Sequence, residues 1–516
     1  MPVRSAECRV RGAVRGAQCG VRALRGALVA WVFASAFLTG ANLSAADTAS
    51  AVVDAVKHGD AAAVRALVKG PSDASALEPD GTTLLHWAVR RDDLAITDIL
   101  LRAGANAKAA NRYGVTPLQI ASTNGNAPMI ERLLAAGADP NTSLPEGETV
   151  LMTAARNGNA AAVRALIAHG ADVNAAERWK GQTALMWAAA GNNAEAAGAL
   201  IDAGAAVKTR SRAGAFSAYL FAVRGGQIAA ARVLLDAGAD VNEALPDGTS
   251  ALVLAIINAH YELAGVLLDR GANPNASAQG WAPLHQIVWS RRPNTGFNLP
   301  GPVPTGAMDS LDLVRKLIDL GADVNARQKK EPKDGYRNQL RRIGATPFLL
   351  AAKSVDVPLM RLLLERGANP ALKTEDDTTP LMAAAGVGIW APGENPGTDE
   401  EALAAVKLAF EAGGGAATDV DKQGETALHG AIYRAGSVAV ASFLIEKGAK
   451  LDARNAKGWT PLTAADGVEY TPNVLKRYPE TAAFLRQVMR ERGLPVPEPG
   501  QPTGPRGAPV AEESAR

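Results

Sequence analysis

Cysteine is nearly absent from this sequence of 516 residues, and both copies, Cys8 and Cys19, lie close to the start. The rest of the chain therefore has no disulfide, no thiolate metal ligand and no cysteine nucleophile. Aromatic residues are also scarce, at 5%, although hydrophobic residues as a whole reach 47%. So few bulky side chains favour thin helical layers that pack closely on small residues over a thick globular core.

The N-terminal segment has the order of a secretory signal peptide. A basic stretch with six arginines and one acid leads into an uncharged apolar run, residues 27–38, and small residues follow up to Ala46. This order predicts removal of residues 1–46, a periplasmic or secreted location and no membrane anchor after cleavage. The alternative is a retained N-terminal anchor, although the apolar run is short for crossing a bilayer.

Neither sign of charge dominates the remainder. The chain has 54 basic and 52 acidic side chains, and residues 1–46 contain six of the basic and one of the acidic ones. Residues 47–516 therefore have 48 basic and 51 acidic side chains, a formal charge of about −3. A near-neutral exported chain is a poor match for nucleic acid. We therefore expect no nucleic-acid partner.

A short phrase, Gly-x-Thr-x-Leu, recurs with drift along most of the chain. Its copies begin at Gly81, Gly114, Gly147, Gly181, Gly214, Gly248, Gly280, Gly344, Asp377, Gly424 and Gly458. The first six intervals are 32 to 34 residues long. A constant period of this length is typical of a solenoid of stacked helical units.

Each unit carries the local signals of two helices and an outward turn. Threonine precedes the first helix, where its hydroxyl can cap free amides, and proline often follows where no amide donor is needed. A second signature, as in residues 133–137 and 234–238, ends the second helix at a glycine suited to left-handed backbone. Apolar residues recur at helical spacing in between, for example Val163, Leu166 and Ile167.

Together these phrases resemble the ankyrin-repeat family over roughly residues 49–490. The resemblance implies an all-α solenoid of paired antiparallel helices with β-hairpin fingers, about eleven repeats and an N-terminal cap. The expected parts are a signal peptide (1–46), cap helices (47–80), repeats (81–458), a capping repeat (459–493) and a disordered Pro-rich tail (494–516). Two departures, Phe216-Ser217 in place of Thr-Pro and Asp377 in place of Gly, are expected to leave the fold unchanged.

We find no catalytic or metal-binding pattern in the sequence. Three of the six histidines, His86, His285 and His429, occupy the Leu-His position of the repeat, where the resemblance implies a structural tie between finger backbones. No two histidines have the spacing of metal ligands on a helix. The segment 386–388, Gly-Val-Gly, lacks the other parts of a phosphate loop and is expected to be a flexible insertion. The sequence predicts a protein that is not an enzyme and has no cofactor or metal.

Extra residues interrupt the period at three places. The first insertion, 291–308, separates the helices of the seventh repeat, the second, 328–343, enlarges the finger after it, and the third, 386–401, separates the helices of the ninth. Proline restricts the backbone of the first and third insertions, and aromatic residues give them rigid surface. Because both emerge between paired helices, on the edge opposite the fingers, we expect them to meet over the eighth repeat.

The candidate partner-binding residues fall into two groups, both rich in the aromatic and arginine side chains that anchor protein interfaces. The insertions and their surroundings contribute Trp289, Arg291, Arg292, Asn294, Phe297, Asn298, Tyr336, Arg337, Arg341, Trp390 and Asn395. The ends of the first helices, which line the concave groove of ankyrin proteins, contribute Arg90, Arg156 and Tyr433.

The leading hypothesis is a binding scaffold outside the cytoplasm that holds a protein partner in the groove or against the insertions. The basic groove favours an acidic or polar partner. One alternative is a small-ligand binding or sensing protein, whose pocket has walls from Trp289, Phe297 and Trp390 and polar ends from Arg291, Arg292 and Asn298. Another is a hydrolase that uses insertion carboxylates such as Glu394 and Asp399.

The signal peptide makes a direct prediction about the exported protein. Its N-terminus should lie within a few residues of Asp47, because the small residues up to Ala46 form the cleavage site. The intact mass of the exported protein measures this. A mass that includes residues 1–46 would contradict the prediction.

Overall fold

The computed structural model describes residues 45–293, 301–332, 339–389, 396–471 and 474–497. Seven of the candidate residues lie outside these ranges: Asn294, Phe297, Asn298, Tyr336, Arg337, Trp390 and Asn395. The chain divides into two compact units, one ending at Leu144 and the other beginning at Pro145.

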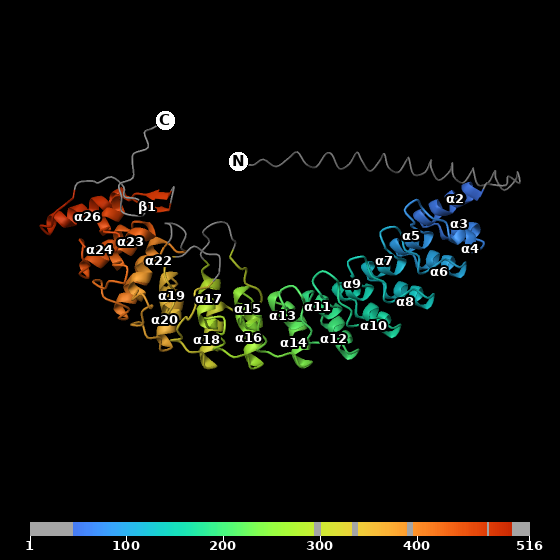
Figure 1. The fold of residues 1–516 in the computed structure, drawn as a ribbon, viewed down its shortest axis with the longest axis horizontal. Helices are drawn as coiled ribbons and strands as arrows, with labels where there is room; N and C mark the ends of the chain where they lie inside the picture. The colour runs from blue at the N-terminus through green and yellow to red at the C-terminus, as the bar shows by residue number, and fades with distance from the viewer. Residues whose placement is uncertain (1–44, 294–300, 333–338, 390–395, 472–473, 498–516) are drawn as a thin grey trace, which may run out of the picture. The chain divides into compact units, whose positions relative to one another are not determined.

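Nearly all regular structure is helical, and short helices follow one another in pairs (Figure 1). The first unit contains α2 (Ala45–His58), α3 (Ala61–Leu67), α4 (Pro71–Ala74), α5 (Leu84–Arg90), α6 (Leu94–Arg102), α7 (Pro117–Asn124) and α8 (Ala127–Ala135). The second unit begins with α9 (Val150–Asn157), α10 (Ala160–Ala168), α11 (Ala184–Ala190), α12 (Ala194–Asp202), α13 (Ala218–Arg224), α14 (Ile228–Asp236), α15 (Ala251–Ile257) and α16 (Tyr261–Asp269).

The helices around the insertions and at the C-terminal end complete the second unit. They are α17 (Pro283–Arg291), α18 (Ser310–Asp319), α19 (Pro347–Lys353), α20 (Val357–Glu365), α21 (Pro380–Ala385), α22 (Asp399–Glu411), α23 (Ala427–Ala435), α24 (Val438–Glu446), α25 (Pro461–Asp466) and α26 (Pro479–Glu491). The strands β1 (Val468–Thr471) and β2 (Val474–Lys476) form a small antiparallel sheet before α26, which the repeat pattern did not predict.

Within the second unit the paired helices form two layers. The first helices pack on one another in the order α9, α11, α13, α15, α17, α19, α21, α23 and α25, and the second helices form a parallel row (Figure 1). The side chains between the rows are mostly alanine, leucine and valine, and Leu234 on α14 is completely buried. Each pair therefore buries its apolar face against its neighbours, as expected for a solenoid.

The capping signals read from the sequence act as expected. The hydroxyl of Thr346 accepts a hydrogen bond from the amide of Leu349 at 3.2 Å, and proline follows at the first helical position. Where Phe216-Ser217 replaces Thr-Pro, Ser217 caps α13 in the same way. Asp377 has a φ of 64°, the left-handed conformation that the missing glycine would take, and a short polar side chain tolerates that conformation.

The three histidines of the Leu-His position tie successive fingers together, as the resemblance implied. The Nε2 atom of His86 lies 2.9 Å from the carbonyl oxygen of Val115. The corresponding distances are 3.1 Å from His285 to Ala345 and 3.0 Å from His429 to Trp459. All three rings are buried. They are structural residues of the repeat.

The fingers are tight turns, and the structure describes no regular β-hairpin in them. Four fingers hold one isolated antiparallel bridge each, at Leu77 and Thr83, Ala176 and Thr183, Arg210 and Ser217, and Ala244 and Ser250. In others a side chain adds to the backbone bonds: the backbone amide of Asn455 donates to the carbonyl of Trp459, and the side-chain oxygen of Asn455 accepts from the amides of Lys457 and Trp459, each at 3.0 Å. The turns are therefore closed by backbone and side-chain hydrogen bonds together.

No helix in the described part of the chain is long and apolar enough to cross a membrane. The apolar run at 27–38 lies outside the described residues.

Replacing Leu234 by alanine should destabilise the array locally by about 2 to 5 kcal/mol, because the side chain is fully buried between helix layers. Repeats share stability with their neighbours. Hydrogen exchange should therefore accelerate first in the repeats that flank α14. Uniform acceleration over the whole chain would contradict this expectation.

Candidate functional site

The first and third insertions meet over the eighth repeat at their described ends. Arg292, just after α17, forms an ion pair with Glu401 on α22, and its Nη1 also donates to the carbonyl of Val355 at 3.3 Å. The amide of Thr398 donates to the same Glu401 carboxylate at 3.0 Å. The pairing with Arg292 holds the pKa of Glu401 below its usual range. This contact agrees with the expected meeting of the two insertions.

Arg291 is engaged inside the protein. Its Nε lies 2.8 Å from a carboxylate oxygen of Asp356, which is almost completely buried, and its guanidinium also bonds Ser310. Asp356 in turn caps α20 by accepting from the amide of Leu359 at 3.2 Å. A buried charge pair that also caps a helix is costly to break. The structure thus gives Arg291 a role in holding the seventh and eighth repeats together.

The end of the first insertion packs back on the preceding repeat. The amide of Thr305 donates to the carbonyl of Ala259 at 3.2 Å, and the Thr305 hydroxyl lies 2.7 Å from Nδ1 of His260. Met308 packs against Gly265 on α16. Deleting residues 291–308 would therefore remove structural contacts as well as any binding surface.

Trp289 packs under the second insertion. Its ring lies edge-to-face with Trp281, with centroids 5.8 Å apart, and the Arg342 guanidinium lies 5.3 Å from its centroid. Arg342 is buried and pairs with Glu331 at 3.1 Å. Trp289 therefore supports the second insertion. The other two aromatic residues of the expected small-ligand pocket, Phe297 and Trp390, lie outside the described residues.

The second insertion crosses to the start of the third. The amides of Gln339 and Leu340 both donate to the carbonyl of Gly388, at 3.1 and 3.2 Å. Gly388 has a φ of +82°, and an added Cβ would lie 2.4 Å from Cβ of Leu340. The enlarged finger is therefore long enough to reach the start of the third insertion.

The Gly-Val-Gly segment is tightly packed, contrary to the expected flexible insertion. Val387 and Ile389 are buried, and the amide of Val387 donates to the carbonyl of Met382 at 2.9 Å. Gly386 and Gly430 are so close that a side chain at either would meet the other's backbone. The segment is a rigid turn that continues α21.

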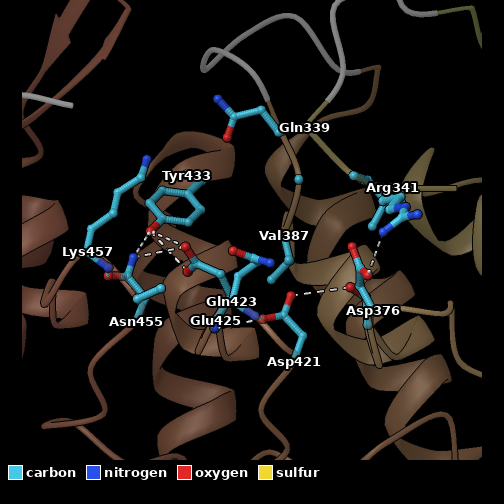
Figure 2. A pocket seen from close by; sticks show the side chains of 14 residues that line it. Gln339, Arg341, Asp376, Val387, Asp421, Gln423, Glu425, Tyr433, Asn455 and Lys457 are labelled. Atoms are coloured by element: carbon cyan, nitrogen blue, oxygen red, sulfur yellow. Dashed lines mark hydrogen bonds and ion pairs between the residues drawn. The ribbon is translucent and has the colours of Figure 1, made fainter. Parts of the chain in front are cut away.

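A pocket of about 290 Å³ opens where the second and third insertions meet the fingers of the last repeats (Figure 2). We call it the junction pocket. Its lining residues come from four segments of chain that are far apart in sequence: Gln339, Leu340, Arg341, Asp376, Thr378, Val387, Gly388, Asp421, Gln423, Glu425, Tyr433, Asn455, Ala456 and Lys457.

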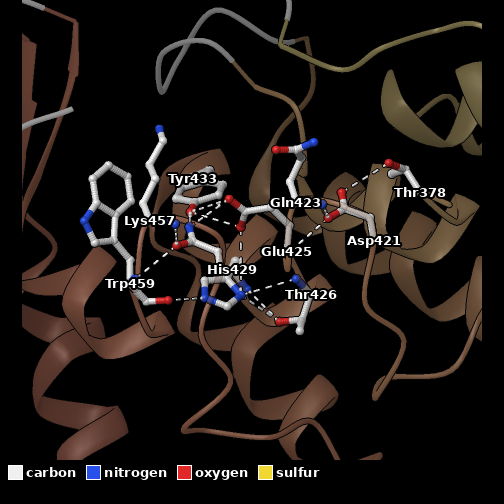
Figure 3. A network of polar contacts seen from close by, with 10 residues as sticks. Thr378, Asp421, Gln423, Glu425, Thr426, His429, Tyr433, Lys457 and Trp459 are labelled. Carbon is white, nitrogen blue, oxygen red and sulfur yellow. Dashed lines mark hydrogen bonds and ion pairs between the residues drawn. The ribbon is translucent and has the colours of Figure 1, made fainter. Parts of the chain in front are cut away.

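The floor of the junction pocket is a polar network (Figure 3). The Tyr433 hydroxyl lies 3.1 Å from both carboxylate oxygens of Glu425, and the Asn455 amide donates to the same carboxylate at 2.9 Å. Asp421 accepts from two backbone amides, those of Gln423 and Glu425, at 2.9 Å, and from the Thr378 hydroxyl at 3.3 Å. The network fixes two carboxyl groups beside an opening.

Burial raises the pKa of Glu425 to about 7, against the lowering effect of Asn455 and Tyr433. Burial also raises the pKa of Asp421, although backbone amides and Thr378 favour its ionised form. A buried carboxylate without a positive partner is unfavourable, and the proton removes that cost. Glu425 therefore changes charge near neutral pH.

The neighbouring cations do not neutralise Glu425. Burial lowers the pKa of His429 to about 4, and its Nδ1 accepts from the Thr426 amide at 3.2 Å, so the ring is neutral. The Lys457 ammonium lies over the Trp459 ring, 4.5 Å from its centroid. Arg341 lies 3.5 Å from Asp376. His429 Nδ1 lies 3.9 Å from a Glu425 carboxylate oxygen but carries no charge, and the charge of Lys457 lowers the pKa of Glu425 by less than burial raises it. Among the described residues, no lysine or arginine forms an ion pair with the Glu425 or Asp421 carboxylates.

Two candidates that the sequence placed in different groups come together in this pocket. Arg341 comes from the second insertion and Tyr433 from the end of a first helix, and both line it (Figure 2). The other two groove candidates lie elsewhere: Arg90 stacks on Trp87 at 5.4 Å, and Arg156 lies over Trp187 at 4.9 Å.

The acidic floor was missed by the sequence analysis. Asp421 and Asn455 occupy the finger position that closes each turn, and Glu425 precedes a capping threonine, so each has an ordinary structural explanation. The signal that could have pointed to the site is the enlarged finger, which carries Gln339 and Arg341 over these residues. In the described ranges, no three His, Cys, Asp or Glu side chains gather as metal ligands would.

Comparison with known families agrees with the fold. A model for ankyrin repeats in three copies matches residues 52–143, 123–211 and 218–296, and a model for a single ankyrin repeat matches residues 423–456. The chain belongs to the ankyrin-repeat proteins, whose repeats generally mediate protein–protein interaction and which are typically scaffolds without enzymatic activity. No curated protein matches the chain in sequence.

Replacing Glu425 by glutamine should flatten the pH dependence of stability around the junction pocket. The pKa of Glu425 is about 7 in the folded protein and 4.5 in the unfolded chain. The contribution of Glu425 to the free energy of unfolding is therefore largest below pH 4.5 and is lost as the pH rises through 7. Both Tyr433 and Asn455 contact one carboxylate oxygen, which the amide oxygen of glutamine can replace.

At pH 8 the variant should be more stable locally by roughly 3 kcal/mol, because the folded and unfolded pKa values differ by about 2.5 units and each unit corresponds to about 1.4 kcal/mol. Hydrogen exchange of residues 421–459, compared at pH 5 and pH 8 after correction for intrinsic exchange rates, measures this. Equal pH dependence in wild type and variant would contradict it.

Proposed function

We propose that this chain is a non-enzymatic scaffold that binds a protein partner outside the cytoplasm, and that the junction pocket receives a basic side chain of that partner. The single observation that carries the proposal is the pocket itself. It is assembled from two insertions and the fingers of the last repeats, and a regular repeat array would not contain the insertion residues that form its rim.

The size and rim of the pocket favour one side chain of a protein over a free small molecule. Its volume of about 290 Å³ lies at the lower limit of ligand pockets, which hold roughly 300 to 1,000 Å³. Gln339, Arg341, Gln423 and Lys457 stand around the opening (Figure 2), where they can bond the backbone next to an inserted side chain. The small-ligand alternative relied on Trp289, which supports the second insertion.

The chemistry of the floor favours a cation. The carboxyls of Glu425 and Asp421 are positioned by hydrogen bonds and pair with no lysine or arginine among the described residues. An ammonium or guanidinium group would restore the ionised form of Glu425 and gain a charge-assisted hydrogen bond. From the sequence, the basic residues of the concave groove predicted an acidic or polar partner. The junction pocket instead favours a basic group of the partner at this one point of contact.

The proposed location depends on the N-terminal segment. A basic stretch, an apolar run and a small-residue site in residues 1–46 support export to the periplasm or beyond. The partner is therefore sought among exported proteins.

The test uses residues 47–516 as bait in the exported fraction of the cells that make the protein. Wild type, Glu425→Gln and Glu365→Gln are compared. Glu365 is exposed on α20 and gives the same chemical change away from the pocket. We expect Glu425→Gln to reduce capture of the partner at least tenfold, as for loss of a buried charge contact, and Glu365→Gln to leave it unchanged.

A photo-crosslinking residue at Gln423, on the rim, then identifies which segment of the partner enters the pocket. The segment should contain a lysine or arginine whose replacement by glutamine abolishes the crosslink. Unchanged capture by Glu425→Gln, with crosslinks spread over unrelated segments, would return the binding function to the first-helix groove.

A further inference from the structure

A large aromatic side chain stands exposed on a finger of the second unit, away from the junction pocket. Trp179 is 79% exposed, the largest fraction among the exposed large hydrophobic residues of the described chain. The Lys180 ammonium lies 4.3 Å from its ring centroid and covers one face of the ring. The remaining surface of the indole is available for contact.

The turn that carries Trp179 is held rigidly by a buried carboxylate. Glu177 is 6% exposed and accepts hydrogen bonds from the amides of Trp179 at 2.6 Å, Lys180 at 2.7 Å and Gln182 at 2.9 Å. Burial opposes ionisation of Glu177, but these donors and Arg212 outweigh it and hold its pKa below the usual range. The finger is therefore preorganised around a negative group that the turn itself satisfies.

Neighbouring fingers brace this turn on both sides. The Arg178 amide donates to the carbonyl of Glu146 at 2.9 Å. From the next finger, the Arg212 amide donates to the carbonyl of Lys180 at 2.8 Å, and its guanidinium donates to the carbonyl of Glu177 at 2.9 Å. Because the turn is already fixed, a partner that contacts Trp179 loses little conformational entropy in doing so.

The charge around Trp179 is positive. Arg178, Lys180 and Arg212 form no ion pair with a carboxylate among the described residues, whereas nearby Arg210 pairs with Glu243 at 2.8 Å and Arg156 with Glu148 at 3.5 Å. This local excess of cations contrasts with residues 47–516 as a whole, which carry 48 basic and 51 acidic side chains.

We infer that the Trp179 finger, residues 177–183 with Arg212, is a second docking surface that binds an acidic segment of a protein partner around an apolar or aromatic side chain. Charge complementarity identifies the segment, since Arg178 and Lys180 form no ion pair among the described residues and Arg212 is offset only by the buried Glu177. Tryptophan and arginine are the residues that most often anchor protein interfaces. The surface does not depend on the junction pocket, which favours a basic group.

The probe is a fluorescein-labelled peptide in which glutamates flank one leucine, and its binding to residues 47–516 is followed by fluorescence anisotropy. Trp179→Ala should weaken binding at least tenfold, Trp179→Phe should retain most of it, and added salt should weaken it. Thermal unfolding of the variants should match that of the wild type, because Trp179 lies outside the core.

Two matched variants locate the effect. Tyr113→Ala removes another exposed fingertip aromatic, 57% exposed and stacked against Arg112, and should leave binding unchanged. Glu425→Gln disables the junction pocket and should also leave peptide binding unchanged. The two proposed surfaces can therefore be tested independently of each other. Equal binding of the peptide by Trp179→Ala, or tighter binding of single-stranded oligonucleotide than of the acidic peptide, would overturn the inference.

Discussion

The carbonyl of Gly388 is the point on which the candidate site depends. It accepts two backbone amides from the second insertion and thereby fixes Gln339 and Arg341 above the fingers of the last repeats. Only a residue without a side chain fits there, because Leu340 occupies the place of a Cβ. Without this contact Asp421, Glu425 and Asn455 would remain ordinary turn residues at the surface of a repeat array. With it, they become the floor of a pocket.

The insertions also serve the array itself. Arg291 pairs with the buried Asp356, Arg292 joins α17 to the start of α22, and Thr305 returns to the sixth repeat. These contacts replace packing that the extra residues would otherwise interrupt, because adjacent layers of a solenoid must remain in register. The aromatic and arginine residues nearest the repeats are thus structural, and the binding role moves to the side chains at the rim and floor of the junction pocket and at the Trp179 finger.

Much of the fold was predictable because the repeat is local. Threonine caps, left-handed glycines and tying histidines each act within one repeat or between neighbours, so their spacing predicted the helix pairs. The junction pocket was not predictable in this way. Whether Gln339 reaches Gly388 depends on how a long finger folds in space, and the pKa of Glu425 depends on burial by residues from several segments.

The central claim is that the ionised carboxyl of Glu425 receives a cation from a protein partner. Calorimetric titration of residues 47–516 at pH 7, in two buffers of different ionisation enthalpy, with a peptide that carries one central lysine, tests it most directly. Since Glu425 has a pKa of about 7, binding should release about half a proton per complex and strengthen as pH rises. The Glu425→Gln variant should release none and bind more weakly. Equal affinity and equal proton release in the wild type and the variant would contradict the account.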